Sequence, residues 1–527
     1  MEQCRVFQKA LKERLAGRSR DRSRWVFVAY DQLTDRVGPL SRCSPEETAV
    51  VLVETTHKGK RRPYHKQKLA WILANQRHFA LELARKGYFV EYLLGDRDYG
   101  ELLEPLASER GPLVMMEAAE RELRESLKPL IDEGLVEVVA HEGWLTTTEQ
   151  FRRSQRGEPP WRMDAFYRLL RRETGILMDD DGPRGGKFSF DEENREPWSG
   201  EPPAPEPPTF EVDEITAEVG ELIRREFADH PGHLDLTRVA ATVEDAQEWW
   251  RWAKERCLTH FGPYEDAMSS KSRTIFHTLV SPLINLHRLL PREVVGDVEE
   301  LEIPLASKEG FIRQVLGWRE FIAHVHRETD GFRDLPEGFE ENYLGADFDL
   351  VPAYWGDDPS GLRCLDEAVA SVVEEGYSHH ITRLMVLSNI ATLLDLSPRQ
   401  VTDWFWVMYV DAYDWVVEPN VLGMGMFALG DLFTTKPYVS GSNYIAKMSD
   451  YCGDCAFDPK KNCPLRSLYW AFLARHEERL DDLGRMGLML GMMRKRSEER
   501  RARDAEIFEE VRRRLAAGKR LDLNELG

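Results

Sequence analysis

The sequence predicts two parts, an N-terminal α/β domain with a parallel sheet and crossover helices, and a large all-helical domain after it. Up to about residue 145, short apolar runs alternate with segments of helical periodicity, as in strands joined by helices. Beyond a proline-rich stretch, apolar residues recur with a period of about 3.6 and strand signals are sparse. The chain has 527 residues and a mass of 61.0 kDa, so two or three domains are expected.

The α/β part contains five apolar runs of strand length and one clear helix. The runs are 25–30, 49–54, 89–94, 113–116 and 136–140, and 66–86 has helical spacing. Parallel sheets bind ligands beyond the carboxyl ends of their strands. Asp31 and Gln32 follow the first strand and Glu54 ends the second, so we expect them near a pocket. No G-x-G-x-x-G follows the first strand, which disfavours a dinucleotide site of that type.

The second half of the chain is predicted to be helical. Residues 196–209 hold so many prolines that they indicate a stiff linker without regular structure. The helical segments expected beyond it are 243–257, 308–327, 366–393, 398–413 and 465–494. The expected organisation is an α/β domain over 20–150, a connector over 151–230, a helical domain over 231–495 and a charged terminal helix over 496–527.

Charge and hydropathy exclude several classes of protein. A net charge of -21 points away from nucleic-acid binding by the whole surface, but net charge is a poor guide where a local patch binds, because the Debye length is only about 8 Å. Two basic runs stand out, 57–68 and 494–503, and the second more often forms a solvated face. The mean hydropathy of -0.49, the lack of a long apolar run and a charged N-terminus argue against a membrane helix or a signal peptide. Seven cysteines, with three in one loop, favour a reducing cytoplasm over a disulfide scaffold.

The three clustered cysteines, Cys452, Cys455 and Cys463, are the most informative feature of the chain. A Cys-x2-Cys pair with a third cysteine eight residues on, followed by proline, brings three thiolates to one point. Iron–sulfur cubanes and tetrahedral zinc sites both need four ligands, and the spacing leaves both open. The remaining cysteines are Cys4, Cys43, Cys257 and Cys364. Cys364 is the preferred fourth ligand because it opens a predicted helix of the same domain.

Aromatic and histidine residues form two further constellations. Residues 404–415 contain six aromatic side chains, which form either an aromatic core stripe or a path for stepwise electron transfer. Just upstream stand His379, His380 and Arg383, and the last two share a helical face. A histidine pair by itself is equally compatible with a structural role.

An ordered set of motifs resembles the iron–sulfur bacterial cryptochromes and photolyases, the prokaryotic (6-4) photolyases also described as deoxyribodipyrimidine photolyase-related proteins. The resemblance covers nearly the whole chain, and the ordered set is specific although no single stretch is decisive. The stretches that carry it are 31–33, 163–168, 185–195, 261–268, 281–282, 314–321, 376–385, 411–424, 436–445 and the cysteine loop.

The resemblance implies a cryptochrome/photolyase fold with FAD in the helical domain, a 4Fe–4S cluster and an antenna chromophore of the 6,7-dimethyl-8-ribityllumazine type in the α/β domain. The implied cluster ligands are Cys364, Cys452, Cys455 and Cys463. The implied flavin contacts are Tyr264, Ser281, Gln314, Arg383, Asp411 and Asn420. The implied lesion-side residues are His380, His379 and Tyr438, the electron donors are Trp404 and Trp355, and the antenna contacts are Asp31 and Glu54.

The implied function is light-dependent repair of (6-4) pyrimidine photoproducts in UV-damaged DNA by a monomeric cytoplasmic enzyme. A rival reading is a cryptochrome-like blue-light photoreceptor with the same cofactors and no repair activity. A second rival is a nucleic-acid-binding protein with a structural metal such as zinc. His379, His380 and Tyr438 favour repair, because a receptor needs no proton donor over the flavin. Phe405 departs from the family, where a tyrosine follows the tryptophan, so the photoreduction path beyond Trp404 is left open.

Overall fold

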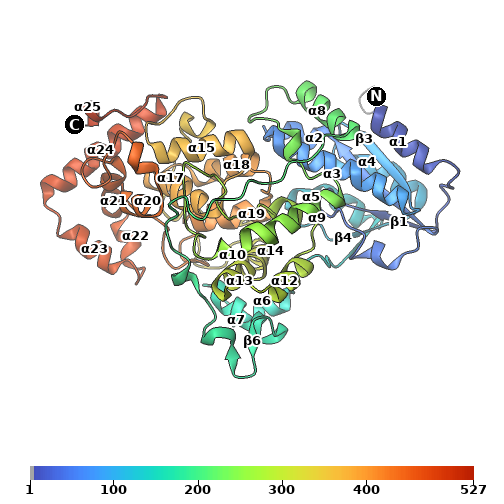
Figure 1. Cartoon of the computed structure of the whole chain (residues 1–527), viewed down its shortest axis with the longest axis horizontal. Coiled ribbons are helices and arrows are strands. Elements are labelled where there is room, and N and C mark those ends of the chain that lie inside the picture. The colour runs from blue at the N-terminus through green and yellow to red at the C-terminus, as the bar shows by residue number, and fades with distance from the viewer. Residues whose placement is uncertain (1–4, 527) are drawn as a thin grey trace.

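The computed structural model describes residues 5–526 and has an α/β domain at one end (Figure 1). The sheet has five parallel strands in the order β3-β2-β1-β4-β5. Their bounds are β1 Arg24–Phe27, β2 Thr48–Thr55, β3 Phe89–Gly95, β4 Leu113–Met116 and β5 Val136–Val139. All five predicted strands are present, and the first is shorter than predicted because its pairing ends at Phe27.

Helices cross between the parallel strands and cover the sheet. Parallel strands cannot be joined by tight turns, so each pair needs a crossover connection. The helices of this domain are α1 Arg5–Leu15, α2 Thr56–Arg61, α3 Lys66–Arg85, α4 Tyr99–Arg110 and α5 Arg121–Asp132. β2 is a continuous apolar run that is almost entirely buried, as expected for a strand covered on both faces.

The connector leaves the α/β domain and returns to it. It contains α6 Thr148–Gln155, α7 Met163–Thr174 and a short hairpin of β6 Met178–Asp179 with β7 Gly182–Pro183. Residues 196–209, all of them described, form neither helix nor strand, as their proline content predicts. α8 Glu214–Glu226 follows and packs on α3, so the connector closes over the first domain.

The rest of the chain is helical, and it contains the longest uninterrupted part of the core. From α9 to α17 the helices are α9 Val243–Trp252, α10 Leu258–Phe261, α11 Ser281–Asn285, α12 Pro291–Glu300, α13 Leu305–Ile312, α14 Glu320–Glu328, α15 Arg363–Glu375, α16 His380–Thr382 and α17 Asn389–Leu393. The remaining ones are α18 Pro398–Met408, α19 Asp414–Val417, α20 Ser442–Met448, α21 Pro464–Arg475, α22 Glu477–Asp481, α23 Gly487–Arg494, α24 Glu498–Ala516 and α25 Leu523–Leu526. No helix in residues 5–526 is long and apolar enough to span a membrane.

Two of the predicted helices are interrupted. The segment 366–393 breaks after α15 because Gly376 takes a left-handed conformation (φ 64°), where its N–H caps the carbonyl of Val372. The chain then turns and places His379 at the start of α16. The segment 465–494 is likewise divided into α21, α22 and α23. The periodic pattern continues across both breaks, so it could not reveal them.

Four π-helical segments interrupt the helical domain. They are Ala253–Cys257, Arg313–Arg319, Arg383–Ser388 and Glu418–Gly425. A π-helical turn inserts an extra residue and redirects the side chains that follow, and such turns are frequent at functional sites. Arg383 and Gln314 lie on two of these segments, and both face the large cavity of this domain.

Candidate functional site

A cavity of about 910 Å³ opens in the helical domain. Its wall is built from α7, the loop before α11, the π-helical segments and residues 435–444. Five of the side chains predicted to contact a flavin line it, namely Ser281, Gln314, Arg383, Asp411 and Asn420. Tyr264 does not line it. Its ring stacks on Phe276, with centroids 5.5 Å apart, in a separate apolar cluster, so its position gives the predicted flavin contact no support.

An ion pair between Arg383 and Asp411 crosses one part of the cavity wall. Arg383 donates from Nη1 to Oδ1 and from Nη2 to Oδ2, each at 3.0 Å, and Ser281 Oγ donates to Oδ2 at 2.6 Å. Burial disfavours the guanidinium charge, but the Asp411 carboxylate outweighs this and raises the pKa of Arg383. The guanidinium also lies 4.2 Å from the ring centroid of Tyr409. The wall therefore presents a rigid, charged pair beside an aromatic ring.

Of the neighbouring pair His379 and His380, only His380 lines the cavity. Its side chain is 42% exposed, and its Nε2 lies 3.8 Å from Oδ1 of Asp266. Tyr444 donates to the other Asp266 oxygen at 3.2 Å. Burial raises the pKa of Asp266, but the bond from His380 and the charge of that histidine, with smaller contributions from Arg195 and Tyr444, lower it overall. His380 thus stands at the cavity beside a carboxylate that holds its orientation.

His379 does not reach the cavity, contrary to its predicted place on the lesion side. It is 2% exposed and absent from the cavity wall, because the turn at Gly376 directs consecutive residues in different directions. Its ring stacks on His277, with centroids 4.2 Å apart and an interplanar angle of 13°. His277 does line the cavity, and sequence reasoning missed it because nothing around it forms a motif. Asp266 was detectable, since it lies within the recognised stretch 261–268.

Tyr438 lies on the cavity wall, as predicted. Burial raises the pKa of its hydroxyl, so the phenol stays protonated. Cationic side chains also line the cavity, namely Arg195, Lys436 and Arg485. Carboxylates line it too, among them Asp191, Glu265 and Asp266, so the wall combines a phenol, an imidazole and charges of both signs and is suited to a large polar ligand.

Trp404 is buried behind the cavity wall and not on it. Phe405 lies between Trp404 and the cavity: it lines the cavity, and its ring centroid is 5.0 Å from that of Trp404. Tyr409 also lines the cavity, 6.0 Å from Trp404, and offers an oxidisable ring that the sequence pattern did not single out. On the far side, Tyr354 packs edge-on against Trp404 at 5.3 Å, and its neighbour Trp355 is half-buried. A continuous set of aromatic rings therefore leads outward from the cavity.

The four predicted cysteine ligands meet around one small cavity. Cys364 comes from α15, Cys452 and Cys455 from the turn after α20, and Cys463 from the residue before α21. Burial and the three neighbouring thiols all raise the pKa of Cys364, so an uncompensated thiolate is unfavourable there. The group is wider than a zinc site: among the described residues, no three cysteine sulfurs lie within 4.8 Å of one another. Sulfurs around one zinc lie about 3.8 Å apart, given a Zn–S bond of about 2.3 Å.

The other cysteines lie elsewhere. Cys257 is buried and Cys43 is partly exposed, and neither lines this small cavity. Cys4 lies outside the described residues.

A second, narrow cavity of about 60 Å³ lies where the two domains meet. Glu54 lines it, as predicted, and Arg77 holds the carboxylate with bonds of 2.8 Å and 2.6 Å. Lys58 also lines it and donates to the hydroxyl of Tyr30 at 2.5 Å, and burial lowers its pKa to about 8. Asp31 is buried but does not line the cavity, and burial raises the pKa of its carboxyl to about 6.

The chain is similar in sequence to a known family and to a known protein. Residues 26–238 match the family described as deoxyribodipyrimidine photo-lyase-related protein. The (6-4) photolyase of Agrobacterium fabrum is 34% identical over 478 residues, which span 87% of this chain and 93% of that protein.

Two solved structures share the fold. A bacterial class III photolyase from Agrobacterium tumefaciens superposes with a TM-score of 0.56 at 17% identity, covering 94% of this chain and 99% of that one. An archaeal photolyase from Sulfolobus tokodaii with two FAD molecules superposes with a TM-score of 0.53 at 14% identity, covering 95% and 97%.

Proposed function

The chain belongs to the deoxyribodipyrimidine photolyase-related family, and we propose that it is a DNA photolyase that repairs (6-4) pyrimidine photoproducts in light. The similarity to the (6-4) photolyase runs through both domains, since it spans 87% of this chain. The observation that carries the proposal is the large cavity with His380 and Tyr438 on its wall. UV-damaged DNA is the corresponding partner.

The large cavity suits FAD. Its volume of about 910 Å³ falls within the range of roughly 300–1,000 Å³ that is usual for ligand sites. Ser281, Gln314, Arg383, Asp411 and Asn420 would hold the cofactor, and the Arg383–Asp411 pair supplies fixed donors and acceptors. When bound and reduced, FAD supplies the photoexcited electron that this chemistry requires.

His380 would donate a proton to the reduced lesion. Its ring stands at the cavity surface, and the carboxylate of Asp266, which also lines the cavity, lies 3.8 Å from its Nε2. Tyr438 would add a hydrogen bond from the facing wall. A damaged dinucleotide must leave the base stack to reach this depth, at a cost of a few kcal/mol that is least for a distorted lesion. Arg195, Lys436 and Arg485 would bind the phosphates that enter with it.

The four cysteines would hold a 4Fe–4S cluster. Their convergence from segments far apart in the sequence supports one shared ligand. The role of such a cluster here is structural, because it ties α15 to the turn after α20 and to α21.

The narrow cavity between the domains is where an antenna chromophore of the 6,7-dimethyl-8-ribityllumazine type would bind, and at about 60 Å³ it would have to widen to reach the roughly 300 Å³ of a usual ligand site. Aromatic side chains from both domains line it, namely Tyr30, Tyr99, Trp406 and Tyr413. Glu54 and Lys58 add an acceptor and a donor for a polar ring. An antenna at this place would lie between the sheet and the helical domain, from which it can pass excitation to the flavin.

The proposal is tested by illuminating a (6-4)-containing oligonucleotide with the reduced holoenzyme. We expect restored thymines by chromatography, in a reaction that requires both light and reduced flavin. A duplex with a cyclobutane dimer serves as the control for lesion specificity. Binding of the lesion without any repair under light would reject the enzyme and favour a photoreceptor.

A further inference from the structure

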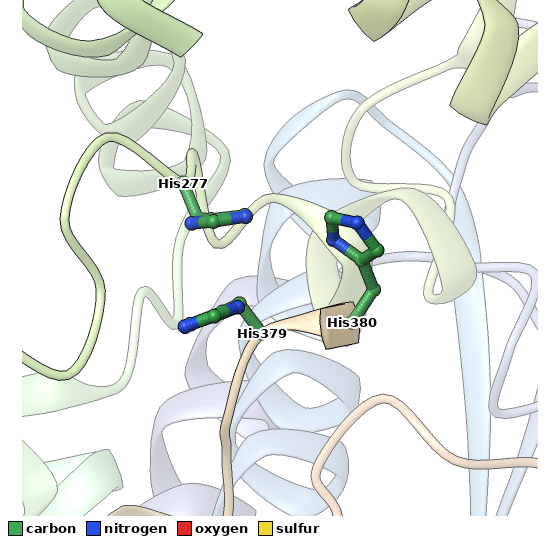
Figure 2. A group of neighbouring side chains, drawn as sticks. All are labelled: His277, His379 and His380. Carbon is green, nitrogen blue, oxygen red and sulfur yellow. The ribbon is translucent and has the colours of Figure 1, made fainter. Parts of the chain in front are cut away.

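Three histidine rings converge at the edge of the large cavity (Figure 2). His277 comes from the loop before α11, and His379 and His380 come from the start of α16. One ring nitrogen of each lies within 4.8 Å of the corresponding nitrogens of the other two. Figure 2 shows the rings of His277 and His379 nearly parallel, one above the other, with the ring of His380 beside them.

The two buried rings present free lone pairs. His277 donates from Nδ1 to the carbonyl of Thr274 at 2.9 Å, so its proton is on Nδ1 and its Nε2 is an acceptor. That Nε2 is buried and has no hydrogen-bond partner, and the same holds for Nδ1 of His379. Burial, with the charge of His380 second, lowers the pKa of His277 to about 3; burial also lowers the pKa of His379. Two neutral imidazoles thus hold unused lone pairs beside a third ring.

The outer contacts of the rings resemble those of metal-ligating histidines. Such histidines donate their other N–H to a backbone carbonyl or to a carboxylate, which sets the tautomer and the ring orientation. The Nδ1–H of His277 donates to the carbonyl of Thr274. The Nε2 of His380 lies 3.8 Å from the carboxylate of Asp266. An unpartnered buried nitrogen is costly unless something binds it, so the two free nitrogens call for a ligand.

We propose that His277, His379 and His380 bind one divalent transition-metal ion, with zinc as the matching metal. Three histidines with a fourth position open to a cavity form a recurring zinc coordination pattern. Nitrogens on one tetrahedral zinc lie about 3.4 Å apart, and each lone pair must point at the ion in the plane of its ring. The stacked rings of His277 and His379, now 13° from parallel, must therefore tilt relative to each other, and all three rings must move closer together. His380 has the freedom to do so, since it is the exposed member of the group.

Metal binding would inhibit repair, a consequence that rests on the proposed function. Histidine binds a metal only when the ligating nitrogen carries no proton, so the ion and the proton compete for His380. A metal-bound His380 is also held in place and is less able to follow the substrate. The three rings would therefore make repair sensitive to free transition metals.

The binding is tested without light or DNA. The holoenzyme, with iron measured in the same sample, is dialysed against zinc and analysed for bound metal. We expect one zinc per chain in the wild type and in the control His260→Phe, whose ring packs at a tilt against Phe276 and is not a member of the group. His277→Phe and His379→Phe should each lose that zinc. Equal zinc in all four proteins would overturn the site.

X-ray absorption at the zinc edge of the wild type gives an independent test that needs no variant. Nitrogen scatterers at about 2.0–2.1 Å support the three histidines, whereas a sulfur shell at about 2.3 Å places the zinc on the cysteines and overturns the proposal.

Repair assays then address inhibition: zinc should lower the repair yield of the wild type. Zinc bound through nitrogen without any such loss would overturn the inhibition alone. A protein that repairs nothing would count against the proposed function and leave the binding result standing.

Discussion

The Arg383 guanidinium and the Asp411 carboxylate face each other in a two-bond ion pair on the wall of the large cavity, with both N···O distances at 3.0 Å. Breaking a buried pair by neutralising one partner typically costs about 3–5 kcal/mol, and partial exposure of Arg383 reduces that cost here. We expect Asp411→Asn to lower the FAD:protein ratio and the melting temperature. Asp431→Asn is the control, because Asp431 does not line the cavity. Unchanged flavin content in Asp411→Asn would contradict the assignment.

The cysteine cluster predicts a selective loss of iron. Cys364→Ala should give protein with little iron and reduced solubility, because α15 loses its tie to the turn after α20. Cys257→Ala is the matched control: Cys257 is also buried but lies outside the small cavity, so iron content should be kept. Elemental analysis distinguishes the two. One zinc and no iron in the wild type would contradict the cluster.

The aromatic path predicts how the flavin is photoreduced. Trp404→Phe should reduce the rate of flavin photoreduction to a small fraction, because Trp404 contacts both the ring of Tyr354 and the cavity-lining rings of Phe405 and Tyr409. Repair by chemically reduced enzyme should remain close to normal. Trp406→Phe is the control, since Trp406 lines the narrow cavity instead. Transient absorption measures the rate, and a normal rate in Trp404→Phe would move the donor to Tyr409.

The position of His380 predicts a loss of repair without a loss of binding. A positioned acid contributes about 10²–10⁴-fold, so His380→Ala should lower the repair yield by that order while FAD content and lesion affinity stay near normal. Asparagine at this position should not rescue repair, because an amide donates no proton at neutral pH. The measurement is repair per absorbed photon. Near-normal yield in both variants would place the acid elsewhere.

The buried histidines predict lower stability in acid. Burial lowers the pKa of His65 and His287 to about 4, and that of His277 and His324 to about 3. Each of these histidines takes up a proton near pH 6.5 in the unfolded chain but stays neutral in the folded chain. The free energy of unfolding therefore has its full value above pH 6.5 and falls below that pH. Each ring lowers the free energy of unfolding by about 1.4 kcal/mol per pH unit in this window.

His324→Phe tests this dependence in a site already lined by the rings of Phe151 and Phe166. The variant should reduce the slope of the free energy of unfolding against pH between pH 6 and pH 4 by the contribution of about one proton. His57→Gln, outside this set of buried rings, should leave the slope unchanged. Chemical unfolding followed by circular dichroism at several pH values gives the slope. An unchanged slope in His324→Phe would show that this ring is protonated in the folded state.

Much of the architecture was predictable because it depends on local pattern. The five strands, α3 and the irregular linker follow from apolar runs, helical spacing and proline content. The break at Gly376 was not predictable in this way, since a glycine within a periodic segment reads equally well as part of a helix. That one break decides that His380 faces the cavity and His379 does not.

The sequence by itself determined the fold class, the family, the cysteine motif and a few of the cavity residues, because motif order and periodicity are encoded along the chain. Only the tertiary structure decided which side chains meet. It brings Cys364 from α15 to the distant cysteine loop, excludes Tyr264 and Asp31 from the cavities and sets His277 against His379. The physical reason is that these contacts join segments far apart in sequence, whose relative placement comes from packing of the whole helical domain and leaves no local pattern.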